Sequence, residues 1–333
     1  MVVTRLRHQH DQGSPLPDQL SSTTVAASTE VTPGCDCYVH RFGSIAPGRR
    51  AGCYPSDMTD AEWAEVRSAM PVPAWLLKRG GRPEAYCHRE MIDAVRYLVD
   101  NGVKWMALPV DFPYWRAVYD FFRRWRAYDY VRELHERLRR TARQRSGRNA
   151  EPSAGIIDSQ SVDASETVGE DSRGYDGGKS RDGRKRHILT DTEGLLLEVT
   201  VTTAEVHDSK AAPALLETFM DEPGRLLKLV WVDSAYQGPA LAKAFARHGV
   251  RVEVVRRSDG QRGFVVLARR WVVERTLSWL ARSRRLNRDH ERRLDHHQQM
   301  VWWAATIRLS RRMAGDAPRW PEKRPERLLR APA

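Results

Sequence analysis

The sequence predicts an α/β protein in which a small all-helical part precedes a larger part built on a mixed sheet. Two observations lead to this fold class. Between residues 53 and 142, apolar side chains recur every three or four positions, as on the buried faces of amphipathic helices. Between residues 154 and 313, short runs of Val, Ile, Leu and Thr alternate with helical segments. Residues 143–153 contain Ser, Gly, Asn and Pro and have the composition of a linker.

Four helices are expected in the first part. Thr59 and Glu62 form a capping box at the start of the first helix. Gly102 stands where the second helix should end. The third carries one apolar face, made of Val118, Phe121, Phe122 and Trp125. A basic fourth helix, 130–145, completes a layout typical of helix-turn-helix DNA binding, although a helical bundle with a solvated basic face is the alternative.

The second part alternates between strands and helices. Strands are expected at 155–158, 185–190, 195–202, 227–233 and 250–255. Helices are expected at 211–220 and 239–249 and from about 268 to 284. Three successive strands followed by alternating helices and strands describe a ribonuclease H-like fold with a five-stranded mixed sheet. A doubly wound nucleotide-binding fold would need a Gly-rich turn after its first strand, and the sequence has none there.

The formal net charge of +12 indicates a polyanionic partner, because Lys and Arg displace the counterions condensed on nucleic acid. A membrane surface is a weaker alternative, since no long basic helix has a clean apolar face. No apolar run approaches the ~18 residues of a membrane span. The side chains expected to contact DNA are Arg123, Arg124, Arg126, Arg184, Lys185, Arg186, Arg270, Arg275, Arg282 and Arg285.

Both ends of the chain are expected to be disordered, with a Ser-, Thr- and Pro-containing leader at 1–52 and a basic tail at 314–333. The N-terminus lacks the apolar segment of a secretory signal. Four cysteines are too few for a disulfide framework and favour a reducing cytoplasm. A zinc site is disfavoured because its ligands would lack the usual spacing. Those ligands would be Cys35, Cys37, His40 and Cys53.

Three acidic side chains are expected to lie close together and to act in one site. Asp158 and Asp233 each follow an apolar run at the end of a predicted strand, and these two strands are neighbours at the centre of the expected sheet. Glu274 lies on the last predicted helix, on a face shared with Arg282 and Arg285. A single strand-end Asp is more often a turn cap, so the combination of the three carries the prediction.

Carboxylates of this kind suit divalent metal ions, because hard cations prefer oxygen ligands. Two ions about 4 Å apart can clamp a scissile phosphate between them. We therefore expect Asp158, Asp233 and Glu274 to be catalytic and metal-binding, with two Mg²⁺ ions that Mn²⁺ can replace.

Two further motifs leave alternatives open. Residues 183–187 (GRKRH) open a hairpin strand, and they either grip phosphates or form a solvated turn. His207 and Asp208 either border the site or cap the following helix, and the cap is favoured. Two pairs on the last helix are expected to serve packing or surface roles. These are His296-His297 and Trp302-Trp303.

Several motifs occur together in a characteristic order. In the first part they are residues 59–63 (TDAEW) and 102–105 (GVKW), and in the second 157–161 (IDSQS), 232–236 (VDSAY) and 271–276 (WVVERT). With these motifs, residues 54–312 resemble the DDE transposases of the bacterial insertion-sequence-five family, within the insertion-sequence-four superfamily. Arg270, four positions before Glu274, also matches the superfamily, whereas Leu267 and Ala281 stand where it favours Tyr and Lys.

The resemblance implies cleavage at terminal inverted repeats and strand transfer into target DNA, with Mg²⁺ as the ion. It carries the three acids onto Asp158, Asp233 and Glu274. It also implies a homodimer that holds two DNA ends, no membrane partner, and a place at the bacterial nucleoid. A catalytically retired DNA-binding relative would have no reason to keep all three acids. A ribonuclease H-type nuclease would lack the basic helical part.

Overall fold

A computed structural model describes residues 52–72, 86–236, 238–255 and 268–315. The disorder expected for the two ends and the zinc alternative at Cys35, Cys37 and His40 lie outside the described residues, as does Leu267. In the described ranges, no helix combines the length and apolar character that crossing a membrane requires.

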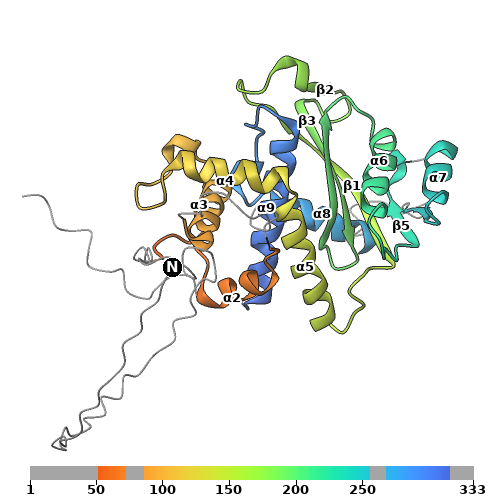
Figure 1. Cartoon of the computed structure of the whole chain (residues 1–333). Coiled ribbons are helices and arrows are strands. Elements are labelled where there is room, and N and C mark those ends of the chain that lie inside the picture. The colour runs from red at the N-terminus through yellow and green to blue at the C-terminus, as the bar shows by residue number, and fades with distance from the viewer. Residues whose placement is uncertain (1–51, 73–85, 237, 256–267, 316–333) are drawn as a thin grey trace, which may run out of the picture. The chain divides into compact units, whose positions relative to one another are not determined.

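Four helices make up the first part, as the sequence predicts (Figure 1). They are α2 (Asp60–Ala69), α3 (His88–Asn101), α4 (Trp115–Ala127) and α5 (Tyr130–Arg145), with a 3₁₀ turn, η2 (Trp105–Ala107), before α4. The Thr59 hydroxyl accepts a hydrogen bond from the Glu62 N–H at 3.1 Å, and the Glu62 carboxylate accepts one from the Thr59 N–H at 3.2 Å. Gly102 ends α3 in the left-handed conformation, with φ of 71°. The capping box and the glycine stop are therefore confirmed.

A mixed sheet forms the second part. Its strands are β1 (Ala154–Asp163), β2 (Gly174–Asp176), β3 (Arg181–Asp191), β4 (Leu196–Thr203), β5 (Leu229–Val232) and β6 (Arg251–Val254). The order is β2-β3-β1-β5-β6, and β4 pairs with β3. Strands β1, β3 and β4 are antiparallel, whereas β1, β5 and β6 are parallel. This is the ribonuclease H-like arrangement, with the short β2 added to the five expected strands.

Four helices accompany the sheet: α6 (Asp208–Met220), α7 (Pro239–Ala246), α8 (Ala268–Leu280) and α9 (Leu294–Met313). Helix α8 ends four residues earlier than expected, and the chain turns into the 3₁₀ helix η5 (Arg284–Leu286). Strand β1 is longer than expected, because it pairs with β3 all the way from Gly155↔Asp191 to Asp163↔Gly183. Asp158 therefore lies in the middle of β1 and not at its end.

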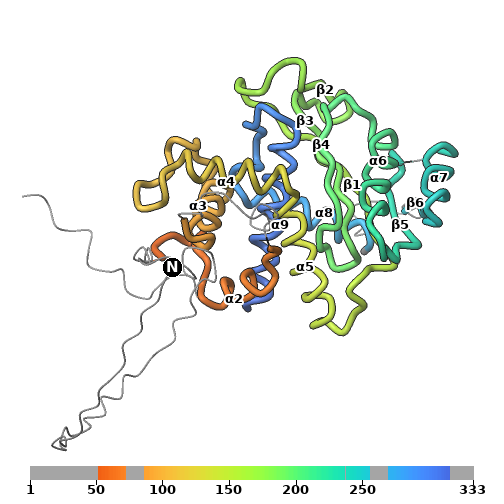
Figure 2. The backbone as a smooth tube through the Cα atoms, in the orientation of Figure 1, coloured from red at the N-terminus to blue at the C-terminus, as the bar shows by residue number. Residues whose placement is uncertain are grey.

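The two faces of the sheet bury different apolar clusters. Ile157 packs with α6 and α7 on one face. Ile156, its neighbour on β1, belongs to a larger cluster that also includes α2 to α5, α8 and α9. Helix α9 contacts α2, α3 and α5 as well as β4 (Figure 2). The helical part thus shares one core with the sheet. The residue pattern changes from helical to mixed α/β at the predicted linker, 143–153. The hydrophobic core is not divided there.

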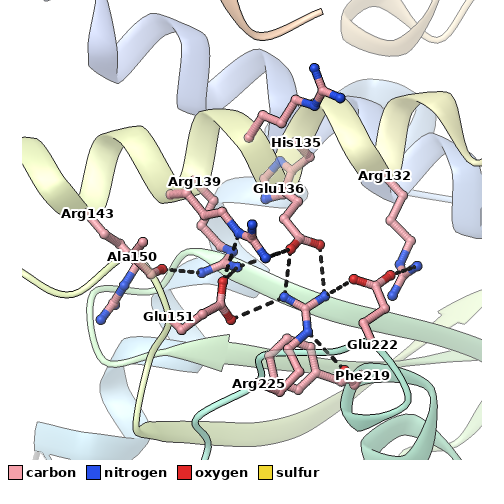
Figure 3. A network of polar contacts seen from close by, with 12 residues as sticks. Arg132, His135, Glu136, Arg139, Arg143, Ala150, Glu151, Phe219, Glu222 and Arg225 are labelled. Carbon is pink, nitrogen blue, oxygen red and sulfur yellow. Dashed lines mark hydrogen bonds and ion pairs between the residues drawn. The ribbon is translucent and has the colours of Figure 1, made fainter. Parts of the chain in front are cut away.

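A network of ion pairs fastens α5 to the segment between α6 and β5 (Figure 3). The guanidinium of Arg225 is buried and binds both oxygens of Glu136, at 2.7 and 2.8 Å. It also contacts Glu151 at 3.2 Å and pairs with Glu222. Bidentate pairs of this kind fix orientation as well as charge. The network therefore fixes the position of α5 relative to the sheet.

Candidate active site

Asp158 and Asp233 emerge at the same level of the sheet. Strands β1 and β5 pair in parallel, with Ile156 opposite Trp231. Asp158 follows Ile156 by two positions on β1, and Asp233 follows Trp231 by two positions, directly after the end of β5. The Asp158 carboxylate accepts a hydrogen bond from the Ser159 N–H at 2.8 Å. The Asp233 carboxylate accepts one from the Ala235 N–H, also at 2.8 Å. The two acids are therefore neighbours at the end of β5, while β1 extends further.

The ionised form of Asp158 is disfavoured at this site. The pKa of Asp158 is raised to about 6, mainly by burial and further by the charge of Asp233. The Ser159 N–H, Lys179 and Arg270 act in the opposite direction without cancelling the rise. A carboxylate whose ionised form is disfavoured in this way gains stability from a nearby cation.

Glu274 reaches Asp233 only through an arginine. One guanidinium nitrogen of Arg270, on the same helix, lies 3.2 Å from a Glu274 oxygen and 4.0 Å from an Asp233 oxygen. The Glu274 side chain is 47% exposed, against 23% for Asp233. Within the described residues, no three His, Cys, Asp or Glu side chains are gathered tightly enough to hold a metal ion. The structure thus brings the two aspartates together, whereas Glu274 forms an ion pair with Arg270.

The aspartate pair fits a divalent cation by its chemistry. Both side chains offer carboxylate oxygens, the donors that Mg²⁺ prefers. The guanidinium of Arg270 already lies near Asp233, so a positive charge is accommodated at this position. The raised pKa of Asp158 fits as well, because burial and the charge of Asp233 disfavour its ionised form, which a cation would stabilise.

Sequence reasoning assigned no role to two other side chains near the pair. The Lys179 ammonium lies 3.3 Å from the Ser159 hydroxyl, next to Asp158. The Tyr236 hydroxyl is buried, and its pKa is raised by burial and by the charges of Asp208, Asp158 and Asp233. Tyr236 belongs to the 232–236 motif, which could have drawn attention to it. Lys179 lies in a loop without periodicity, so the sequence held no comparable signal.

Three basic side chains of β3 that were expected to contact DNA are buried. Arg184 is fully enclosed and donates to Asp289 at 2.8 Å and to a backbone carbonyl at 2.6 Å. Arg186 donates to the Leu286 carbonyl at 2.7 Å. Lys185 lies 3.1 Å from Asp176 and is only 6% exposed. The prediction that these residues grip phosphates is wrong, because all three side chains are buried. Carboxylates pair with Arg184 and Lys185, whereas two guanidinium nitrogens of Arg186 are enclosed without a hydrogen-bond partner among the described residues.

Arg285 requires the same correction. It lies in η5 and not on α8, so it does not share a helix face with Glu274. Its guanidinium binds Glu291 at 2.7 Å and the Val103 carbonyl at 2.9 Å, and its side chain is 7% exposed. The early end of α8 is the reason, because the chain turns and directs Arg285 inward.

The basic fourth helix is neutralised in a similar way. Every arginine of α5 pairs with a carboxylate, as Figure 3 shows for part of the set. The six are Arg132, Arg137, Arg139, Arg140, Arg143 and Arg145. Arg126 of α4 also pairs, with Asp295. Arg123, 59% exposed and 4.0 Å from Asp120, and Arg124, stacked on Phe121, remain predicted DNA contacts.

The contacts of His207 and of the two pairs on α9 show their roles. His207 caps α6, with its ring nitrogen accepting a hydrogen bond from the Ser209 N–H at 3.3 Å, as favoured. His297 is buried and lies 3.0 Å from Asp289, and Trp302 and Trp303 are also buried. Packing is therefore the role of both pairs on α9.

A ribonuclease H-like sheet with paired aspartates on its central parallel strands defines a DDE-type catalytic domain. The family model described as "Transposase DDE domain" matches residues 149–309, and the one described as "Putative transposase of IS4/5 family" matches residues 58–135. Over these two segments the chain belongs to the DDE transposases of the IS4/5 type.

A curated relative supports the same grouping. The "Putative transposase for insertion sequence element IS402" of Burkholderia cepacia is 31% identical over 125 residues. The matched region is 36% of this chain and 59% of that protein, so the chain spans less than two thirds of the relative's length.

Proposed function

We propose that the protein is a transposase that binds the terminal inverted repeats of an insertion sequence, cleaves DNA strands and joins them to target DNA. One observation carries the proposal, namely that Asp158 on β1 and Asp233, directly after β5, lie at the same level of two neighbouring parallel strands. Burial, and after it the charge of Asp233, raises the pKa of Asp158, which favours a cation between the two acids. The family match supports the choice of DNA as the substrate.

In this proposal Asp158 and Asp233 hold Mg²⁺ or Mn²⁺, and Glu274 completes the ligand set. When bound, two such ions would activate the attacking oxygen and stabilise the leaving oxygen of the phosphodiester. Glu274 is tied to Arg270 by an ion pair at the surface. Pairs of this kind are worth only about 0–1 kcal/mol, so Glu274 can exchange Arg270 for other partners at little cost. Arg270 is then free to contact a DNA phosphate.

Among the helices before residue 143, α4 is proposed to read the end sequence through Arg123 and Arg124, while residues 154–313 carry out the chemistry. Two copies of the chain are proposed to hold the paired ends, because strand transfer joins both ends of one element. The net charge of +12 supports a DNA partner and association with the nucleoid.

Strand cleavage by the purified full chain tests the proposal. With Mg²⁺ and a labelled fragment that carries the ends of the element, we expect nicks at the ends. Asp233→Asn should slow cleavage by more than about 100-fold, because several kcal/mol of charge stabilisation are lost. Asp182→Asn is the matched control, because Asp182 is an exposed carboxylate of β3. Undiminished cleavage by Asp233→Asn would contradict the assignment.

A further inference from the structure

One side of α8 carries alternating tryptophan and arginine side chains. Trp271, Arg275 and Trp279 follow one another at intervals of four residues, and Arg282 comes just after the helix. Residues four apart share a helix face, so these side chains form a stripe beside the one that holds Arg270 and Glu274. Together with Arg308 of α9, these four residues are called the tryptophan–arginine stripe below.

Two guanidinium groups of the stripe, those of Arg275 and Arg308, are stacked on the indole rings. Arg275 lies 4.6 Å from the ring centre of Trp271 and 4.5 Å from that of Trp279. Arg308 lies 3.3 Å from the ring centre of Trp279, so α9 contributes to the same array. Trp271 is 44% exposed, which is unusual for so large an apolar side chain. The stripe is thus an ordered surface feature.

The positive charge of the stripe is not neutralised within the part of the chain that the structure describes. No carboxylate there lies within the 4.0 Å of an ion pair from Arg275, Arg282 or Arg308. The pKa of Arg308 is lowered to about 10, first by burial and then by the charges of Arg282, Arg275, Arg312 and Arg311. The six arginines of α5, in contrast, all have carboxylate partners. The described residues therefore leave three guanidinium groups without a carboxylate partner on and beside the helix that carries Glu274.

Stacking prepares these arginines for phosphate. An indole covers the flat face of a guanidinium and leaves its N–H edge free to donate in the plane. Phosphate oxygens accept from that edge, frequently through two parallel hydrogen bonds. Arg275 donates from one nitrogen to the Glu193 carbonyl, at 2.9 Å, which fixes its direction, and its Nε is buried, so its remaining nitrogen is the one available to a phosphate. Side chains held in this way lose little conformational entropy when they bind.

We propose that the tryptophan–arginine stripe binds the phosphate backbone of duplex DNA and holds the duplex alongside the Asp158–Asp233 pair. The inference rests on the proposed function, because it takes DNA as the partner. Charge complementarity selects this partner, since three guanidinium groups have no carboxylate partner among the described residues and the chain has a net charge of +12. The position agrees with it, because Arg270 of the same helix reaches Asp233. Trp271, Trp279 and Arg308 thereby become DNA-binding residues.

Equilibrium binding of a fluorescent 30-base-pair duplex to the full chain in EDTA tests the stripe without requiring cleavage. Arg282→Gln and Arg308→Gln, made separately, should each weaken binding about three- to tenfold and lower the slope of log affinity against log salt by about one. Arg137→Gln is the matched control, since it removes one positive charge from an ion pair on α5 and should leave the slope unchanged. Arg308→Lys should keep the slope.

Each outcome decides for or against the stripe. Slopes for Arg282→Gln and Arg308→Gln equal to that of Arg137→Gln would overturn it. Unchanged DNA binding together with lost binding of a polyglutamate peptide would also overturn it, in favour of an acidic protein partner. Arg282 is exposed, so its replacement leaves folding intact, which an unchanged melting temperature verifies. If the stripe variants lose binding while the wild type never cuts, only the proposed function fails.

Discussion

Arg184 joins strand β3 to the segment that precedes α9. Its guanidinium is fully enclosed, pairs with Asp289 and donates to the Glu291 carbonyl. Asp289 in turn lies 3.0 Å from His297, and its pKa is lowered to about 2, where the charges of His297 and Arg184 outweigh its burial. The cluster is therefore a buried charged junction between the sheet and the last helix.

Arg184→Gln should lower the free energy of unfolding by about 3–5 kcal/mol, because Asp289 would remain buried without its partner. Arg181→Gln, on the same strand, should cost less than about 1 kcal/mol, since Arg181 is half-exposed. Urea denaturation at pH 7 measures both. A small loss of stability for Arg184→Gln, combined with a large loss of DNA affinity, would restore the phosphate-binding role.

The difference between Asp158 and Arg184 shows what residue patterns can predict. Asp158 and Asp233 were predictable because each follows an apolar run, and parallel strands place such positions together. Arg184 and Arg186 belong to a basic run typical of an exposed turn. Their burial depends on Asp289 and Leu286, about a hundred residues later, and local sequence holds no sign of that contact.

Helix α8 is positioned by the turn between β3 and β4. The Thr276 hydroxyl donates to the Gly194 carbonyl at 2.9 Å, and Arg275 donates to the Glu193 carbonyl at the same distance. Gly194 has a φ of +84°, and a Cβ there would lie 2.6 Å from the Thr276 hydroxyl. The turn therefore fixes the position of α8 relative to the sheet, and with it the position of Glu274.

Gly194→Ala should destabilise the protein by about 2 kcal/mol or more and slow cleavage, because left-handed strain adds to a clash that displaces α8. Gly224→Ala separates the two effects. Gly224 has nearly the same φ, +83°, but a Cβ there would meet nothing within 4 Å. We expect Gly224→Ala to lose only about 1–2 kcal/mol and to keep the wild-type cleavage rate. Equal cleavage rates for the two variants would argue against positioning by the turn.

The elements themselves were largely predictable. The apolar stripe of α8, made of Val273, Leu277 and Leu280, is buried as its spacing predicts. The end of α8 was not predictable, since no glycine or proline marks it. Arg285 pairs with Glu291 after the chain has left α8, and the six-residue spacing of the two is not a helical one. The short β2 was missed for a related reason, because three residues are too few to show alternation.

At the scale of the whole molecule, composition predicted a basic protein but not where its free charge would lie. The six arginines of α5 are neutralised by carboxylates from α2, from α5 itself and from the sheet part. Among the described residues, Arg275, Arg282 and Arg308 lack such partners, and they lie on α8, just after it, and on α9. Because α9 packs against both parts, the helices and the sheet form one core that presents both the acids and the stripe.

Metal-specific rescue of strand cleavage tests most directly whether Asp233 binds the metal ion. In Asp233→Cys the hard carboxylate becomes a softer thiolate, which Mn²⁺ tolerates better than Mg²⁺. We expect cleavage by Asp233→Cys to fall by more than about 100-fold in Mg²⁺ and to recover by at least about tenfold in Mn²⁺, relative to the wild type in the same ions. Wild-type cleavage rates for Asp233→Cys in Mg²⁺ would contradict metal binding by Asp233, and with it the proposed active site.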